Sequence, residues 1–492
     1  MASMLNLDSK LYKNMRKIFF LYLFISVILT SCNKDFNTIN DNIKAAQVVP
    51  ASTLFSNAQR ELVDNMTTPS VNTNVFRLYA QYWAETTYAD ESQYNITTRN
   101  TARGWWNPLY RDVLKNFNES ERLINNDKSF TDLQLKKNQL ALNEILSVYT
   151  FSILVNTFGD IPYSEALDFT NATPKYDDAA TIYKDLIKRL DAAITSMNVS
   201  SGSFGSADLV YGGDISKWIK FANSLKLRIG MTLADVDPAT SKTLVEQAAP
   251  NVFTSNADKA SMMYLASPPN TNPTWVNLIQ SGRIDFVAAN TFIDTLTSLN
   301  DPRIPFFFNK DKNGGYSGGI YGSVNNNANF SLPSSKITDP SFPGVLMDYA
   351  EVEFYLAEAV ERGYSVGGTA EDHYNKGVTA SILDWGGKDT DAATYLLNPL
   401  VAYKTASGSY KKKIGTQKWI SLYNRGFEAW TEYRRLDYPI LNPVSAADAQ
   451  GPFPVRFTYS DQEPNLNKVN YDAASAKIGG DKVTTKLFWD KF

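Results

Sequence analysis

Aromatic side chains are the most abundant groups in this sequence that could bind a ligand. The chain has 27 Tyr, 27 Phe and 9 Trp, or 13% of its residues. Beside Asn and Gln, such rings stack on sugars or grip extended peptides, and they equally fill helix interfaces.

Trp105 and Trp106 are adjacent and precede Asn107. Neighbouring helical residues point about 100° apart, so both rings cannot lie centrally in one buried stripe. We therefore predict that one ring faces solvent or a groove; the alternative is one core and one half-buried packing residue.

A second group of candidate ligand-binding residues lies near predicted loops: Trp83, Tyr88, Trp275, Tyr316 and Tyr321. The first two flank the loop in AQYWAETTYADESQY, which favours an aromatic cluster there. The other three are scattered through a stretch rich in Asn, Pro, Gly and Ser, at about residues 250–345. An irregular stretch of that length inside a compact protein is usually functional or disordered. The aromatic residues within it favour an ordered, functional insertion.

Cysteine and histidine are too scarce for most catalytic and metal chemistry. The chain has one Cys, Cys32, and one His, His373. A single histidine argues against a multi-His metal site and against a Ser-His-Asp arrangement. Asp311 begins a segment that resembles a calcium loop, but the twelfth position is Gly322 rather than Glu. We predict no catalytic residue, no metal site and no cofactor.

One carboxylate falls on an apolar helix face. On a helical wheel for residues 345–362, Glu353 lies among apolar residues, whereas Glu351 and Glu358 are predicted to point away. Burying an unpaired carboxylate costs several kcal/mol, so Glu353 needs a hydrogen-bonded or cationic partner. We predict a structural buried acid paired with an Arg of the 425–435 helix; the alternative is a general acid.

The overall charge excludes one class of partner. The formal net charge is -3 and the sequence pI is about 5.5. Nucleic-acid binding requires clustered Lys and Arg against phosphates. The composition therefore argues against a nucleic-acid partner, and 43% hydrophobic with 20% charged residues is typical of a folded globular protein.

The N-terminal region has the pattern of an export signal. Arg16 and Lys17 precede the mostly apolar residues 18–29, which rise only about 18 Å as a helix. The bilayer core is about 30 Å thick, so this segment is typical of a cleaved signal rather than of a membrane span. Met15 is a better start for a signal of normal length than Met1. We predict a signal segment at 1–32, with its true start at Met15.

The signal ends at the single cysteine of the chain. The run from Leu29 to Cys32, LTSC, resembles a bacterial lipobox, in which the thiol is lipidated and Cys32 becomes the first residue. The alternative is an ordinary signal peptide with a chance Cys. Residues 33–46 are polar, Asn-rich and without periodicity, which predicts a flexible linker. We expect residues 47–492 to form the folded domain, attached to a membrane through the lipid alone.

The folded domain is predicted to be mainly α. Apolar residues recur at helical spacing in most of the chain, and strand signals are few. Helices are expected at these places: from Ser52, 75–83, from about Pro108, 132–157, 177–197, 215–233, 345–362, 370–385 and 417–435. The last of these carries a stripe formed by Trp419, Tyr423, Phe427 and Trp430, which we interpret as core.

Several segments together resemble one family. The lipobox with its Asn-rich leader is followed by TFGDIPYSEAL at 157–167, LMDYAEVEFYLAEAVERG at 346–363 and QKWISLYNRGFEAWTEYRRLDYP at 417–439. This combination resembles the SusD/RagB outer-membrane lipoproteins, in the branch described as SusD-like, starch-binding associating with outer membrane. The resemblance runs from the leader to the tail, although each motif alone is weak.

The resemblance implies a scaffold of tetratricopeptide-like helix pairs with a loop-rich, nutrient-binding face. It also implies a lid on a SusC-like TonB-dependent transporter that captures oligosaccharides, or peptides in some members, without catalysis. Two alternatives stay open: the same scaffold binding peptides, and a surface-tethered glycoside hydrolase. The motifs at 346–363 and 417–439 are helical, so they indicate the fold more than the ligand.

Overall fold

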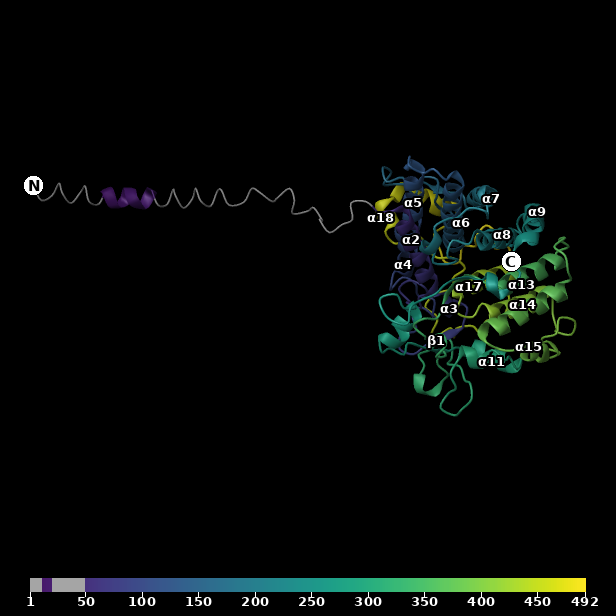
Figure 1. Cartoon of the computed structure of the whole chain (residues 1–492). Coiled ribbons are helices and arrows are strands. Elements are labelled where there is room, and N and C mark those ends of the chain that lie inside the picture. The colour runs from purple at the N-terminus through teal and green to yellow at the C-terminus, as the bar shows by residue number, and fades with distance from the viewer. Residues whose placement is uncertain (1–10, 20–48) are drawn as a thin grey trace, which may run out of the picture. The chain divides into compact units, whose positions relative to one another are not determined.

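The computed structural model describes residues 11–19 and 49–492 (Figure 1). Residues 11–19 are helical. Cys32, the linker 33–46 and most of the predicted signal lie outside the described residues. The chain divides into two compact units, Met1–Val49 and Pro50–Phe492, and the fold described below is that of the second.

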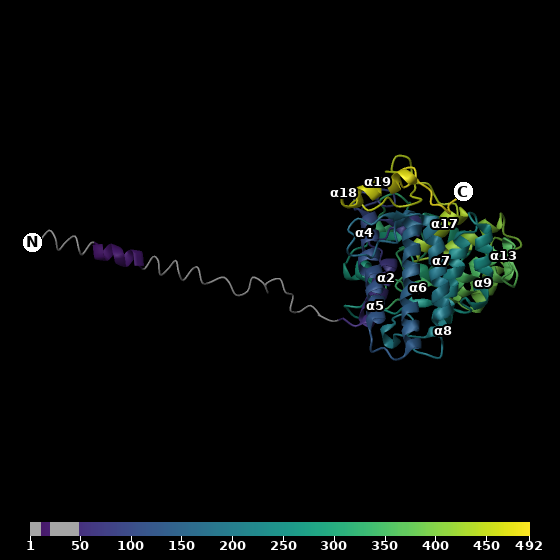
Figure 2. The same ribbon diagram turned by 90° about the horizontal axis from the view of Figure 1, so that it is seen from above.

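An array of helices forms one side of the second unit, and each member packs on the next along the chain (Figure 2). Its members are α2 (Ala51–Thr67), α5 (Lys115–Asn126), α6 (Leu133–Phe158), α7 (Ala179–Ser196), α8 (Ile215–Thr232) and α9 (Pro238–Ala248). Asp132 caps α6, accepting hydrogen bonds from the backbone N–H groups of Gln134 and Leu135. Among the described helices, α6 is long and apolar enough to cross a membrane, but 89% of that window is buried inside the body. It is the central helix of the core.

A second group of helices packs on this array through α13, which contacts α8, α14 and α16. The group comprises α13 (Tyr349–Glu361), α14 (Ala370–Trp385), α15 (Asp389–Leu396), α16 (Tyr410–Ser421) and α17 (Gly426–Leu436). The short helix α3 (Phe76–Tyr79) packs on α17, and the last helices in the chain are α18 (Glu463–Leu466) and α19 (Lys468–Lys477). The mainly α prediction is confirmed.

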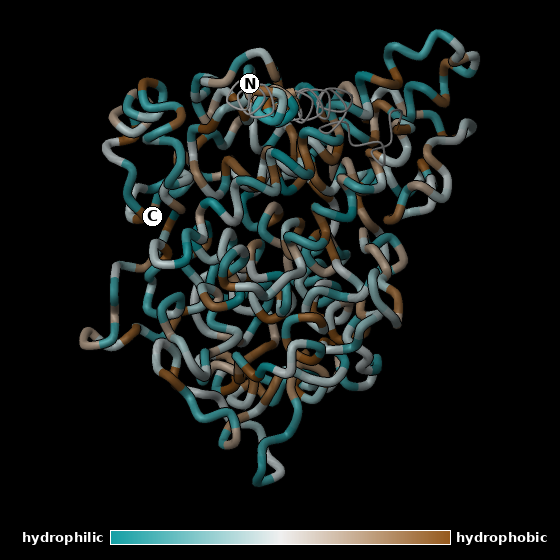
Figure 3. Tube along the Cα trace, turned by 90° about the vertical axis from the view of Figure 1, so that its left-hand side faces the viewer, coloured by the Kyte–Doolittle hydropathy of each residue, from teal (hydrophilic) through white to brown (hydrophobic). Residues whose placement is uncertain are grey.

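The described strands form three short antiparallel ribbons. They pair β1 (Trp83–Glu85) with β5 (Phe286–Ala288), β2 (Ile161–Pro162) with β3 (Tyr176–Asp177), and β4 (Ala260–Met262) with β6 (Gly344–Met347). The stretch 250–345 is folded around two of them and adds α10 (Pro273–Trp275), the π-turn η5 (Val276–Gln280), α11 (Asn290–Ser298) and α12 (Ile304–Phe307). Hydrophobic segments gather inside the body and hydrophilic loops lie outside (Figure 3).

Three predicted helices have different bounds. The helix expected from about Pro108 begins earlier, at α4 (Thr101–Pro108), and continues through the π-helix η1 (Leu109–Leu114) into α5. Pro108 has no N–H to donate, and the helix widens to π geometry directly after it. The helix expected at 75–83 ends at Tyr79, where the chain turns into β1. The helix expected at 417–435 is two helices, broken at Asn424 with φ of 72°. All four residues of the 419–430 stripe are nevertheless buried, as predicted.

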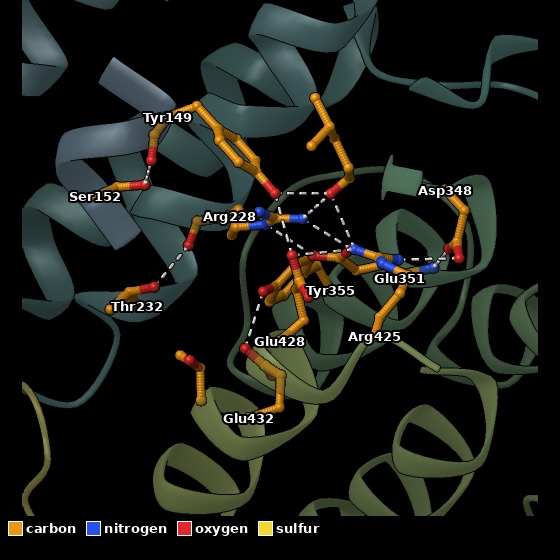
Figure 4. A network of polar contacts seen from close by, with 12 residues as sticks. Tyr149, Ser152, Arg228, Thr232, Asp348, Glu351, Tyr355, Arg425, Glu428 and Glu432 are labelled. Carbon is orange, nitrogen blue, oxygen red and sulfur yellow. Dashed lines mark hydrogen bonds and ion pairs between the residues drawn. The ribbon is translucent and has the colours of Figure 1, made fainter. Parts of the chain in front are cut away.

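A ladder of buried ion pairs joins the two helix groups (Figure 4). Arg228 on α8 contacts Glu351 on α13 at 2.8 and 2.9 Å, and Arg425 contacts both Glu351 and Asp348, the latter at 2.9 Å. The backbone oxygen of Leu346 accepts hydrogen bonds from both arginines. Glu351 is therefore buried, contrary to the wheel, because it faces cations rather than solvent.

The ladder continues toward the end of α17. Glu432 contacts Lys418 at 2.8 Å and Arg435 at 2.6 Å, and Arg435 also grips Glu358 through two hydrogen bonds of 2.6 and 2.5 Å. Burial would raise the pKa of Glu351, Glu358 and Glu432, but the adjacent cations outweigh it and hold all three below their usual range. The prediction that Glu358 points away is also wrong, for the same reason.

Glu353 is a buried acid, as predicted, but its partner is not an arginine of 425–435. Its Oε2 lies 2.6 Å from Nδ1 of His373, whose Nε2 lies 2.9 Å from the backbone oxygen of Gly367. Burial opposes charge on the imidazole, but the hydrogen bonds to Glu353 and Gly367 prevail and raise the pKa of His373 above 6.5. Of the arginines in 425–435, Arg425 and Arg435 belong to the ladder, and Arg434 donates to the backbone oxygens of Asn156 and Val455.

Breaking the ladder should destabilise the protein strongly. In Glu351→Gln, Arg228 and Arg425 lose their shared counter-charge while buried, so we expect a loss of about 3–5 kcal/mol in the free energy of unfolding. Asp472→Asn, which removes an exposed pair with Lys468, is the control and should change it by less than about 0.5 kcal/mol. Denaturant titration monitored by circular dichroism measures both. Equal effects would contradict a structural role for the ladder.

The His373–Glu353 pair should make stability fall as pH rises. Because the folded-state pKa of His373 is raised, its contribution is fully present below about pH 6.5 and is lost as pH rises through the folded-state pKa. Glu353→Gln should lower the melting temperature at about pH 6 and flatten the decline between about pH 6 and 8. If the melting temperatures of the variant and the natural protein change by the same amount over that pH range, the coupling is disproved.

Candidate ligand-binding site

A hollow of about 540 Å³ opens in the loop-rich part of the protein. Three chain segments line it: residues 69–72 after α2, residues 85–99 from β1 onward, and residues 276–286 from η5 to β5. In Figure 1, β1 and these loops lie at the end of the body away from α5, α6 and α7. A concave site with a few converging polar groups and an exposed ring is the usual setting for a small-molecule ligand.

The β1–β5 ribbon forms the back wall of this hollow. Glu85 pairs with Phe286 in the register, and the N–H of Thr86 donates to the backbone oxygen of Asp285 at 3.0 Å. Behind the wall, the Trp83 ring packs against Phe286 with centroids 5.3 Å apart. The wall is therefore fixed to the core before any ligand arrives.

Tyr88 and Arg99 form the exposed platform of the site. The Tyr88 side chain is 58% exposed, and the Arg99 guanidinium lies 5.5 Å from the centre of its ring. Arg99 is held by Glu91 at 2.5 Å and by Asp90 at 3.7 Å. A tyrosine ring supported by a guanidinium presents one apolar face to stack on a ligand and a polar edge for hydrogen bonds.

Polar groups surround the platform on the other two segments. Asn72 and Asn277 line the hollow, and an amide can donate to and accept from a ligand hydroxyl at once. Arg283 and Asp285 add an ion pair with contacts of 2.7 and 2.9 Å. The Arg283 side chain is 58% exposed, so its unused N–H groups remain accessible to a ligand.

The floor contains a pair of buried acids, Glu85 and Glu91. Oε2 of Glu85 accepts hydrogen bonds from the N–H and hydroxyl of Ser92 at 3.0 and 2.6 Å, and Oε1 of Glu91 accepts from Arg99 at 2.5 Å. Burial, reinforced by the charge of Glu91, raises the pKa of Glu85 well above its usual value. Burial likewise raises the pKa of Glu91, against the opposing charge of Arg99.

Of the aromatic residues predicted near loops, Tyr88 lines the hollow. Trp83 is buried behind the wall, and its indole N–H donates to the Tyr423 hydroxyl at 2.9 Å. Tyr321 is buried against Ala84 and Val287. Trp275 and Tyr316 are half-buried, and neither is among the residues that line the hollow.

The prediction that Trp105 or Trp106 faces a groove is wrong. Their side chains are 0% and 6% exposed. Trp105 packs on Phe427 and donates to the Thr157 hydroxyl at 3.1 Å, while Trp106 packs on Phe158. Two neighbouring helical rings can both be buried here because α4 has core on more than one side. The half-buried Asn107 donates to Gln462, also away from the hollow.

Sequence reasoning missed most of the residues that build the site. Arg99, Arg283 and Asn277 come from segments without helical periodicity, so nothing in their local pattern indicated a shared site. Glu85 and Glu91 lie in the segment AQYWAETTYADESQY, whose rings predict an aromatic cluster, and its acidic residues are a second signal for the site. Their burial depends on the pairing of β1 with a strand some 200 residues away.

Comparison with known proteins places this architecture. The chain is similar to a chitin-binding protein of known structure, with a TM-score of 0.79 and 28% identity over 90% of this chain and 100% of that one. It is also similar to a chitin-binding SusD homologue from Flavobacterium johnsoniae (TM-score 0.75, 27% identity, 89% and 98% covered). A SusD homologue from Bacteroides uniformis gives a TM-score of 0.76 at 26% identity, with 89% and 99% covered. No curated protein matches the chain.

These structures define the class: a SusD-type helical protein with a loop-rich face. The family model described as starch-binding associating with outer membrane, a SusD-like family, matches residues 42–460. The chain belongs to this SusD-like family, as the motifs at 157–167, 346–363 and 417–439 predicted.

Proposed function

We propose that this protein is a cell-surface lipoprotein that captures oligosaccharides in the hollow around Tyr88. The observation that carries the proposal is the exposed Tyr88 ring, supported by Arg99 and surrounded by the amides of Asn72 and Asn277. A flat ring beside hydroxyl-binding amides matches a sugar, which has an apolar face and a polar edge. The family description, starch-binding, supports the same ligand class.

Chitin fragments are the first ligands to test. Two of the similar structures are of chitin-binding proteins, at 28% and 27% identity. An N-acetyl group carries both an amide donor and an acceptor, which the amides and the Arg283–Asp285 pair could meet. A peptide would present the same groups along its backbone, so peptides form the second arm of the test.

The proposal makes the protein a binder rather than a hydrolase. Glycosidases need two carboxyl groups at least about 5 Å apart. Each carboxyl group that lines the hollow has a structural partner: Glu91 pairs with Arg99, Asp285 pairs with Arg283, and Glu85 accepts from Ser92. In the described part of the chain, no cluster of three or more His, Cys, Asp or Glu side chains could hold a metal ion.

The family description also supports attachment to the outer membrane. In our proposal Cys32 carries the lipid, and residues 33–46 tether the folded body beside a SusC-like TonB-dependent transporter, for which it serves as the lid. A tether of this kind raises the effective concentration of the lid at its partner without new contacts.

Tyr88→Ala should weaken binding of chitohexaose by about tenfold or more, because the stacking face is lost (about 1.4 kcal/mol is tenfold). The control is Phe169→Ala, since Phe169 is also an exposed ring, 65% accessible, beside a cation, Lys115. Calorimetry with chitin, starch and peptide probes measures the effect. If Tyr88→Ala and Phe169→Ala bind equally well, the hollow is not the site; turnover of any probe would overturn the binder assignment.

Cys32→Ser should release a folded protein from the membrane and impair uptake. The change removes the thiol that accepts the lipid, and Cys32 precedes the unit Pro50–Phe492 in the sequence. Cell fractionation and growth on the bound glycan measure the two effects, with Ser31→Ala as the control. Membrane retention of Cys32→Ser would refute lipidation at this residue.

A further inference from the structure

A second cavity, of about 200 Å³, lies beside the ion ladder. Its lining comes from the C-terminal end of α2, from residues 336–348, from the end of α14 and from residues 421–428, where α16 is followed by α17. It shares no lining residue with the hollow around Tyr88. A cavity of about 150 Å³ inside a protein holds benzene, so this one has room for a single six-membered ring with small substituents.

The innermost cation of the cavity is Arg77, which is 2% exposed. Its Nε donates to the side-chain oxygen of Asn424 at 2.9 Å, and its two terminal nitrogens donate to the backbone oxygens of Thr68 and Thr67 at 3.0 and 2.7 Å. All three partners are neutral, and a guanidinium has five N–H groups. Burial lowers the pKa of Arg77 to about 10. Among the described residues, Arg77 is therefore a buried cation without a contacting carboxylate.

Lys336 is a second cation of this kind, half-buried at the mouth of the cavity. Its Nζ donates to the backbone oxygen of Trp385 at 2.5 Å and lies 5.7 Å from the centre of the same ring. Burial lowers the pKa of Lys336, although the charge of Asp384 opposes the shift. Asp384 is already paired with Lys259 at 2.7 Å. We call Arg77 and Lys336 the unpaired cations, with reference to the described part of the chain.

The charges around the cavity leave one positive charge uncompensated. Arg425 lines the cavity, and this arginine and its ladder neighbour Arg228 face three carboxylates: Asp348, Glu351 and Glu428. The Lys259–Asp384 pair is internally neutral. The two unpaired cations therefore exceed the remaining negative charge by one. A ligand with a single negative charge would balance the set, whereas an uncompensated buried charge is costly.

The rest of the lining suits a sugar ring. Trp385 and Tyr423 supply aromatic surface, which packs on the apolar face of a sugar. The carboxylates of Asp348 and Glu428 accept hydrogen bonds only when ionised, so they match ligand hydroxyls rather than a second ligand anion. Sulfate has no ring for the aromatic wall, and benzoate has no hydroxyl for these acids. A sugar acid carries all three features: a ring, hydroxyls and one carboxylate.

We propose that this cavity is a second binding site, for a single hexuronic acid, in which Arg77 and Lys336 supply the counter-charge for the ligand carboxylate. Trp385 and Tyr423 lie along the sugar ring, and the neighbouring acids accept from its hydroxyls. A guanidinium with free N–H groups is well suited to a planar carboxylate. The site is independent of the proposed capture of oligosaccharides around Tyr88.

Calorimetric titration of the full chain with glucuronate tests the ligand class. Glucose is the matched neutral probe, because it has the same ring without the carboxylate, and it should bind at least about tenfold more weakly, since charge-assisted hydrogen bonds are lost. Benzoate and sulfate test the other anions and should also bind more weakly. No binding of glucuronate, or equal binding of glucose, benzoate or sulfate, would overturn the proposal.

Lys336→Gln should weaken glucuronate binding by about tenfold, because it removes one of the two counter-charges. Lys413→Gln is the matched control: Lys413 is also half-buried, donates to the backbone oxygen of Tyr403 at 2.8 Å and lies 5.1 Å from the centre of that ring. Lys413 does not line this cavity, so its loss should change the affinity by less than about twofold. Equal effects of the two changes would contradict the proposed site.

A second variant covers the case in which Lys336→Gln does not fold. Val345→Phe adds a ring to the lining without removing a side-chain hydrogen bond, and it should abolish glucuronate binding in a protein that circular dichroism shows to be folded. Undiminished binding by this variant would refute the site. A crystal structure with glucuronate then locates the carboxylate; a position away from Arg77 and Lys336, including one beside Tyr88, would refute it as well.

Discussion

The rest of the structure depends on the need to neutralise buried charge between α13 and α17. Glu351, Glu358 and Glu432 are each held by buried cations, and removing any partner leaves an uncompensated charge in the core. Buried ion pairs add little net stability, because desolvating the charges is costly, but only a few helix arrangements satisfy them. The geometry of guanidinium against carboxylate therefore fixes how the helices after residue 345 lie against α8 and the α2–α9 array (Figure 4).

This scaffold holds the β1–β5 ribbon that forms the back wall of the hollow. The indole N–H of Trp419 on α16 donates to the backbone oxygen of Ala80 at 2.8 Å, and the Tyr82 hydroxyl donates to the backbone oxygen of Trp419. Trp83 on β1 is bonded to Tyr423. The strand behind the hollow is thus fastened to the same helices that the ion ladder orients.

The aromatic residues show how far local pattern can reach. Their abundance was open to two explanations, and most of the rings proved to fill helix interfaces: Phe76 alone contacts Trp105, Phe427 and Trp430. A helical wheel assumes one buried face. This assumption failed for Trp106, because its helix is covered on several sides. It failed for Glu351, because a carboxylate that pairs with buried arginines can itself be buried.

The sequence by itself determined the helical class, most helix positions, the burial of Glu353 and the family, because these follow from short-range periodicity and continuous motifs. Tyr88 was a candidate for the same reason, because the loop beside it can be recognised from the local sequence. Only the tertiary structure decided that Tyr88 shares a hollow with Arg99, Asn277 and Arg283, and that His373 pairs with Glu353. These contacts join residues distant in sequence and depend on strand pairing and helix packing, which no local pattern encodes.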